Sequence, residues 1–141
     1  MLRLLVAVDG SETSDKMVDH LLLRFGCYKE PVEMHLLNVQ FPLHGDVTSF
    51  VGTEQVQRFH HDEGIKALSA ARAKLDAAGV RYVFHIGVGD PAQVIVHYAK
   101  DRQCDQIVMG SRGLGSVSSL VLGSVTMKVM HLTELPVLIV K

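Results

Sequence analysis

The stretch RYVFHIGVGDPAQVIVHYAKDRQCDQIVMG, Arg81 to Gly110, contains two apolar runs separated by a helical pattern. The runs at 81–88 and 105–110 are short and rich in β-branched residues, which is typical of strands. Between them, Asp90 can cap a helix that begins at Pro91. The apolar residues that recur at helical spacing in this segment are Ala92, Ile95, Val96 and Ala99. The stretch therefore predicts a strand, a helix and a second strand, the repeating unit of parallel sheets.

The same alternation continues on both sides of this stretch. Apolar runs predict further strands at 2–8, 32–39 and 136–140. Helical patterns predict helices at about 14–25, 53–78 and 125–132. Because strands and helices alternate strictly, we expect an α/β doubly wound sheet joined by right-handed crossovers. Arg81 and His85 alternate with apolar residues in the third strand, which predicts a wetter face and a position toward the edge of the sheet.

Turn and cap residues mark the ends of these elements. Ser14 or Thr13 is expected to cap the first helix, and Gly79 to end the long second one. The segment from Gln40 to Thr53 has no such pattern and is expected to be a mobile loop beside the carboxyl ends of the strands. Open α/β sheets bind their ligands at that edge.

Composition limits the possible classes of protein. A chain of 141 residues predicts one domain over 1–141 with a single core. With 48% hydrophobic and 21% charged residues, the chain is expected to be globular rather than disordered. The net charge of −1 argues against a broad electrostatic surface for nucleic acid or for an anionic membrane.

The cysteines and the N-terminal residues indicate the cellular compartment of the protein. Cys27 and Cys104 lie far apart without a CxxC spacing, so a disulfide framework or a zinc site has little support. The first apolar run stops at Asp9, which is too short for a signal peptide core or a membrane span. These features predict a cytoplasmic protein.

The segment MGSRGLGSVSSLVLGS, Met109 to Ser124, follows one predicted strand and leads into the last predicted helix. Its glycines let backbone N–H groups approach an anion, and the helix start adds unpaired N–H groups. Arg112 is its one cation, and Ser124 and Thr126 can add hydroxyl donors. A phosphate group fits this chemistry, although a purely structural glycine-rich turn with a serine cap is the alternative.

Two other phosphate motifs do not fit this segment. A P-loop requires Lys followed by Ser or Thr, and Ser116 and Val117 stand at those positions. A dinucleotide fingerprint requires a third glycine where the chain has Ser118, and it should follow the first strand.

The spacing Gly110-x2-Gly113-x9-Gly123-Ser124 resembles the nucleotide-binding signature of the universal stress protein family. The likeness covers nearly the whole chain, including LLVAVDGSETS, LLNV, GDPAQVIVHYA and LPVLIV. The resemblance implies a Rossmann-like open five-stranded parallel sheet of order 3-2-1-4-5 with helices on both faces. It also implies a homodimer and a site for ATP or AMP.

The resemblance also suggests a role for individual residues. Asp9 would face the ribose or a phosphate-bound metal, with Mg²⁺ as the companion of a triphosphate. Val39 would meet adenine through its backbone, near Ala7, where some ATP-binding relatives carry proline. Met109 fits either a contact with the base or a place in the core. The residues that match the phosphate loop are Gly110, Arg112, Gly113, Gly123, Ser124, Val125 and Thr126.

Three functions remain open at this point. The first is an adenine-nucleotide-binding regulatory protein of the stress response, acting on an unidentified protein partner. The second is a slow ATPase or autophosphorylating enzyme, for which the sequence offers hydroxyls and Asp9 but no recognisable catalytic base. The third is a ligand-free dimer module with a structural loop. We therefore assign no catalytic residue.

The last predicted strand and the histidines lead to further expectations. The segment Val137–Val140 would form an edge strand without protective lysine or internal proline, so we expect two copies to pair through it in antiparallel fashion. His60 and His61 are adjacent and cannot share one face of a helix, so we expect a solvated surface there and no metal site. His35 and His85 lie in predicted strands and are interpreted as packed or edge histidines.

Overall fold

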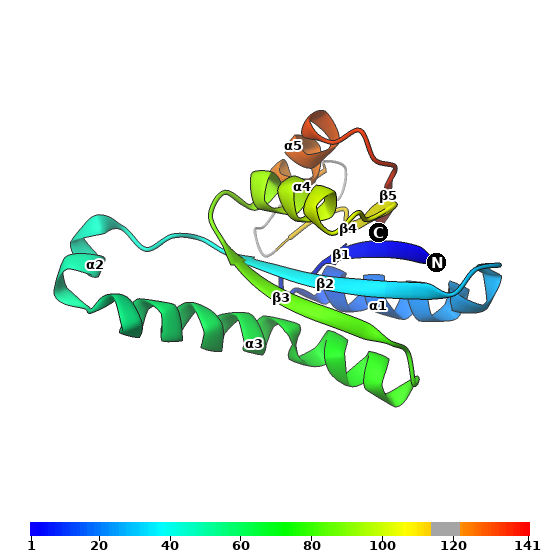
Figure 1. Ribbon diagram of the computed structural model, residues 1–141, viewed down its shortest axis with the longest axis horizontal. Helices are drawn as coiled ribbons and strands as arrows, with labels where there is room; N and C mark the ends of the chain where they lie inside the picture. The colour runs from blue at the N-terminus through cyan, green and yellow to red at the C-terminus, as the bar shows by residue number, and fades with distance from the viewer. Residues whose placement is uncertain (114–121) are drawn as a thin grey trace.

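The computed structural model describes residues 1–113 and 122–141, and the side chains of all of these except 46–48. Five strands form one parallel sheet in the order β3-β2-β1-β4-β5, as expected (Figure 1). The strands are β1 (Leu2–Ala7), β2 (Val32–Gln40), β3 (Tyr82–Val88), β4 (Gln106–Gly110) and β5 (Val137–Val140). All neighbouring strands are parallel, so their carboxyl ends lie along one edge of the sheet.

Helices cover both faces of the sheet (Figure 1). The helices are α1 (Glu12–Arg24), α2 (Gly45–Phe50), α3 (Thr53–Ala77), α4 (Pro91–Asp101) and α5 (Ser124–Leu132), with a 3-10 helix η1 (Phe25–Cys27) after α1. Helices α1 and α3 pack on one face, and α4 and α5 on the other. Among the described residues, none of the helices combines the length and the apolar character that a membrane span requires.

The alternation of side chains along β1 divides the core into two halves. Leu4 and Val6 point toward α1 and α3, whereas Leu5 points toward α4 and α5, and all three are fully buried. Burial of both faces explains the continuous apolar run in this strand. Strand β3 lies at one edge of the sheet, as its alternating pattern predicted.

Two expectations are wrong, one about the start of α1 and one about residues 40–53. Helix α1 is capped by Ser11, whose side chain accepts the Ser14 N–H, rather than by Ser14 or Thr13. The earlier cap fits because Asp9 and Gly10 already turn the chain after β1. The segment at 40–53 is also not one loop, because it contains α2, which is under two turns long and too short for a periodic pattern to reveal. Gly79 follows α3 with a φ of +66°, as expected for a glycine at that end.

Polar groups cover the apolar edge strand β3 from both faces. On one face, the Arg72 guanidinium lies 4.2 Å from the centre of the Phe84 ring. On the other, the ring of His85 stacks on Tyr98 of α4 at 5.3 Å. His85 is thus an edge histidine, as the sequence suggested.

Helix α3 approaches β3 most closely at Gly64. A β-carbon at this position would lie 2.6 Å from three side-chain atoms of Ile86. Alanine favours helices over glycine by about 1 kcal/mol, but overpacking costs about 1–3 kcal/mol. Because three atoms collide at 2.6 Å, the overpacking cost should lie in the upper part of that range, and Gly64→Ala should lower the free energy of unfolding in urea by about 1–2 kcal/mol.

Two comparisons isolate this contact. Ser69→Ala, on the exposed side of α3, should change stability little. In an Ile86→Ala background, Gly64→Ala should no longer be destabilising, because the colliding atoms are gone. A Gly64→Ala protein as stable as the wild type would contradict the close packing of α3 on β3.

Candidate functional site

The predicted binding residues gather at the carboxyl edge of the sheet. They come from the ends of β1, β2 and β4, from the loop after β4 and from the first turn of α5. The residues are Ala7, Asp9, Val39, Met109, Gly110, Arg112, Gly113, Gly123, Ser124, Val125 and Thr126. The middle of the predicted phosphate loop, residues 114–121, lies outside the described residues.

Asp9 is held in a defined conformation directly after β1. Its Oδ1 accepts the Ser11 N–H at 2.9 Å, which closes a turn through Gly10, where φ is +82°. Its backbone N–H donates to the Ser14 hydroxyl at 3.2 Å. Within the described parts of the chain, these bonds use Oδ1 and leave Oδ2 for a contact across the carboxyl ends of the strands.

Oδ2 of Asp9 faces the loop that follows β4. A β-carbon built on Gly113 would lie only 2.7 Å from this oxygen, so a side chain at Gly113 would displace the carboxylate. The structure thus brings together two residues that are 104 positions apart and that the sequence assigned to one site. Arg112, beside Gly113, is exposed and available to an anion.

The two described ends of the loop are fastened to each other. Gly123 N–H donates to the Ser111 carbonyl at 2.8 Å, and the Thr126 hydroxyl donates to the Gly110 carbonyl at 3.0 Å. Thr126 is buried, so this hydroxyl fixes α5 to the end of β4. Ser124, in contrast, is exposed at the edge.

The N-terminus of α5 differs from those of α1 and α4. Ser11 and Asp90 cap those two helices with side-chain oxygens. Helix α5 has Gly123 at its N-cap, and no side chain bonds to its first N–H groups among the described residues. The first N–H groups of a helix lack intrahelical partners and carry partial positive charge, which suits a phosphate group.

The residues expected near a base differ in exposure. Ala7 and Val39 are half-buried and border the core half under α4 and α5. Met109 is only 5% exposed and belongs to that core half. The position of Met109 favours the core role that the sequence left open.

Helices α4 and α5 are joined beside this edge. Lys128 of α5 donates to Oδ2 of Asp90 at 3.0 Å, while Oδ1 of Asp90 accepts the Gln93 N–H. The hydrogen bonds from Lys128 and then from Gln93 lower the pKa of Asp90. Asp90 therefore caps α4 as expected and also links it to α5.

Sequence reasoning missed a second set of residues that support the site. Asn38 of β2 is buried, and its amide donates to the Val8 carbonyl at 2.8 Å. The Gln40 amide in turn donates to Asn38 Oδ1 at 2.7 Å. A lone asparagine inside the apolar run HLLNV was the available signal, because buried amides need partners.

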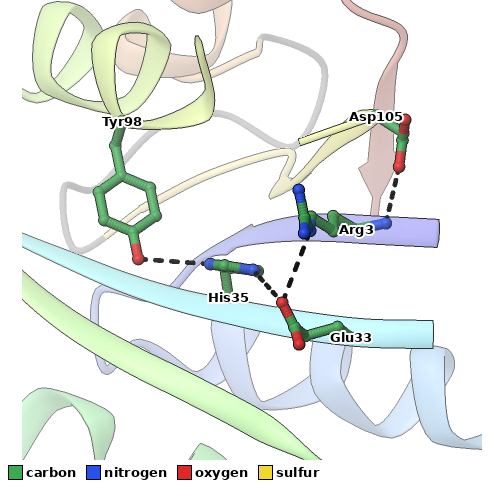
Figure 2. Close-up of polar contacts among 5 residues, drawn as sticks. All are labelled: Arg3, Glu33, His35, Tyr98 and Asp105. Atoms are coloured by element: carbon green, nitrogen blue, oxygen red, sulfur yellow. Dashed lines mark hydrogen bonds and ion pairs between the residues drawn. The ribbon is translucent and has the colours of Figure 1, made fainter. Parts of the chain in front are cut away.

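A separate polar cluster lies toward the amino ends of the strands (Figure 2). His35 approaches Glu33 Oε1 at 2.9 Å through Nε2 and the Tyr98 hydroxyl at 3.4 Å through Nδ1. The Arg3 guanidinium Nε lies 3.7 Å from the same Glu33 oxygen. The backbone N–H of Arg3 donates to Asp105 Oδ2 at 2.8 Å. His35 is thus a packed histidine with partners on both ring nitrogens, as the sequence suggested.

The expectation for His60 is wrong. His60 is buried and its Nε2 lies 3.1 Å from the Phe41 carbonyl, whereas His61 is exposed. The reason is that α3 turns His60 toward the chain that leaves β2. A histidine that fixes a neighbouring loop cannot be told from a surface histidine by helical spacing alone.

Known proteins match this chain over its whole length. The model of the Universal stress protein family matches residues 1–141. The chain belongs to the universal stress protein family. Universal stress protein YxiE of Bacillus subtilis is 33% identical over 150 residues, covering 99% of this chain and 98% of YxiE. The resemblance inferred from the sequence is confirmed.

Solved universal stress proteins share the fold. MJ0577 of Methanocaldococcus jannaschii aligns with a TM-score of 0.81 at 29% identity, over 99% of this chain and 94% of that one. A universal stress protein in complex with cAMP aligns with a TM-score of 0.72 at 26% identity, over 99% of this chain and 97% of that one. At least one structural relative therefore holds an adenine nucleotide.

The two thiols of this universal stress protein should react very differently. Cys27 is exposed, whereas Cys104 is buried, and burial and then the nearby Asp105 charge raise the pKa of its thiol to about 11. The thiolate is the reactive form of cysteine. At pH 8, native protein should therefore rapidly release one equivalent of aromatic thiol per chain from an aromatic disulfide reagent, and unfolded protein should release two. Cys27→Ser should remove the rapid phase. Two rapid equivalents from native protein would contradict the burial of Cys104.

Proposed function

We propose that this chain is one nucleotide-binding domain over 1–141 and binds an adenine nucleotide, ATP or AMP, at the carboxyl edge of the sheet. One observation carries the proposal. The bare backbone of Gly113 lies against Asp9 Oδ2, beside the start of α5, which no side chain caps among the described residues. The family and the cAMP-bound relative support an adenine nucleotide as the ligand.

We assign the phosphates to the α5 side of the site. The N–H groups of Ser124, Val125 and Thr126 supply donors at the start of the helix. The exposed Arg112 guanidinium adds charge and paired donors, and the exposed Ser124 hydroxyl adds another donor. The Thr126 hydroxyl already donates to Gly110, so Thr126 contributes its backbone N–H.

We assign the nucleoside to the β1 and β2 side. Asp9 Oδ2 suits a ribose hydroxyl, or a Mg²⁺ ion that travels with a triphosphate, because each prefers an anionic oxygen. The half-buried Ala7 and Val39 offer an apolar surface for the base, and the Val39 backbone offers hydrogen bonds. Such a site binds and orients a nucleotide, which suits a cytoplasmic stress-response regulator that passes its nucleotide state to a protein partner.

A side chain at Gly113 tests the proposal. Gly113→Val would place carbon atoms where Asp9 Oδ2 and the phosphates are expected, and should weaken ATP binding about tenfold or more, the equivalent of one charge-assisted hydrogen bond. Isothermal titration with ATP and with AMP, each with Mg²⁺, measures the effect. Gly26→Val is the matched control, because a β-carbon at Gly26 meets no atom within 4 Å. Wild-type protein that binds neither nucleotide at millimolar concentration would refute the proposal.

We also propose that two copies pair through β5. The Ile107 N–H donates to the Pro136 carbonyl and the Ser111 N–H to the Val140 carbonyl, each at 3.0 Å. Even-numbered residues of β5 thus direct their backbone groups at β4, while Val137 and Ile139 direct theirs outward. Within the described residues no strand pairs with this edge, which is apolar and lies opposite β3 in the sheet.

The outward direction of the Val137 and Ile139 backbone groups gives a specific test of this pairing. Ile139→Pro removes an outward N–H without touching the bonds to β4, so it should convert a dimer into a monomer in light scattering while the far-ultraviolet spectrum stays unchanged. Ile139→Val keeps the N–H and should remain dimeric. A wild-type monomer at micromolar concentration would exclude the β5 pairing.

A further inference from the structure

Asn38 is a polar residue in the middle of the core. It lies in β2, which is paired with β1 on one side and β3 on the other, and it is only 2% exposed. Its side chain makes two hydrogen bonds, donating to the Val8 carbonyl and accepting from the Gln40 amide. A buried amide costs stability unless it is paired, so these bonds define where Asn38 can sit.

The partner of Asn38 is the residue at which β1 leaves the sheet. Strand β1 ends at Ala7, and the Val8 N–H still donates to Leu37 of β2 at 2.9 Å. The Val8 carbonyl instead accepts its hydrogen bond from the Asn38 side chain. Asn38 therefore sets the direction of the chain at the peptide bond that joins Val8 to Asp9.

A buried serine holds the other side of the same peptide bond. The N–H of Asp9 donates to the hydroxyl of Ser14, which is 4% exposed. The carbonyl and the N–H of one peptide group are thus fixed by two side chains, one from β2 and one from α1. Oδ1 of Asp9 accepts the Ser11 N–H, and the other carboxylate oxygen, Oδ2, is directed at Gly113.

We propose that Asn38 and Ser14 are positioning residues of the nucleotide site, which act by holding the Val8–Asp9 peptide and so the Asp9 carboxylate opposite Gly113. This inference rests on the proposed function. Leucine at position 38 would keep the branched shape of the asparagine side chain, although it is larger, and it would donate nothing to Val8. The chain could then turn at Val8, and Asp9 would leave its place against the loop.

The first experiment compares two buried polar residues of the same strand. Asn38→Leu should weaken binding of ATP with Mg²⁺ about tenfold, as expected for residues coupled through one hydrogen-bond network. His35→Leu is the matched control, because His35 is also buried but points toward α4 near the amino ends of the strands (Figure 2). His35→Leu should lower the melting temperature as Asn38→Leu does, and leave ATP affinity unchanged.

A double-mutant cycle separates positioning from a general loss of order. In an Asp9→Ala background, Asn38→Leu should cost less than about twofold, because the group that it positions is absent. In an Arg112→Ala background, Asn38→Leu should still weaken ATP binding about tenfold. Equal losses in both backgrounds would overturn the inference, since they would show that Asn38 acts on the whole fold.

Ser14→Ala keeps the test decisive if Asn38→Leu does not fold. It removes one hydroxyl from α1, and it should show the same coupling to Asp9 and the same independence from Arg112. If wild-type protein binds ATP, Asp9→Ala weakens binding and both Asn38→Leu and Ser14→Ala bind normally, only the positioning inference fails. If wild-type protein binds no nucleotide, the proposed function fails and the inference with it.

Discussion

The point at which β1 stops determines the geometry of the whole carboxyl edge. This strand lies at the centre of the sheet and is paired on both sides with parallel neighbours. Beyond the buried Val8, the chain turns out toward solvent at Asp9 and Gly10. A two-sided apolar core cannot absorb a shift of this strand, because close packing leaves no room on either face. The end of β1 therefore fixes the positions of the side chains at the carboxyl ends of the strands.

The sequence was sufficient for the architecture because the signals for it are local and repeated. Apolar runs such as LRLLVAV predict buried strands, and Asp90 with Pro91 predicts the start of a helix, as the structure has it. The same applies to the glycine spacing, which identified the family. In each case several residues close in sequence support the same prediction, so a misread residue at one position does not change that prediction.

The supporting contacts could not be predicted because they join residues far apart in the chain. Asn38 bonds to Val8, 30 residues away, and His60 bonds to Phe41 across the turn that contains α2. The cap of α1 at Ser11 depends on how Asp9 folds back, which composition does not reveal. Periodicity shows which face of an element is apolar, but not which carbonyl a buried polar group will meet.

The two edges of the sheet differ in a way that bears on assembly. Strand β3 has the Arg72 guanidinium over Phe84 on one face and the paired rings of His85 and Tyr98 on the other. Both contacts lie on the faces of β3, whereas a further strand would pair in the plane of the sheet. If two copies join through β5, each uses the same edge of its sheet, so the contact is isologous. Such a contact closes at two chains by its two-fold symmetry and does not by itself extend into a fibre.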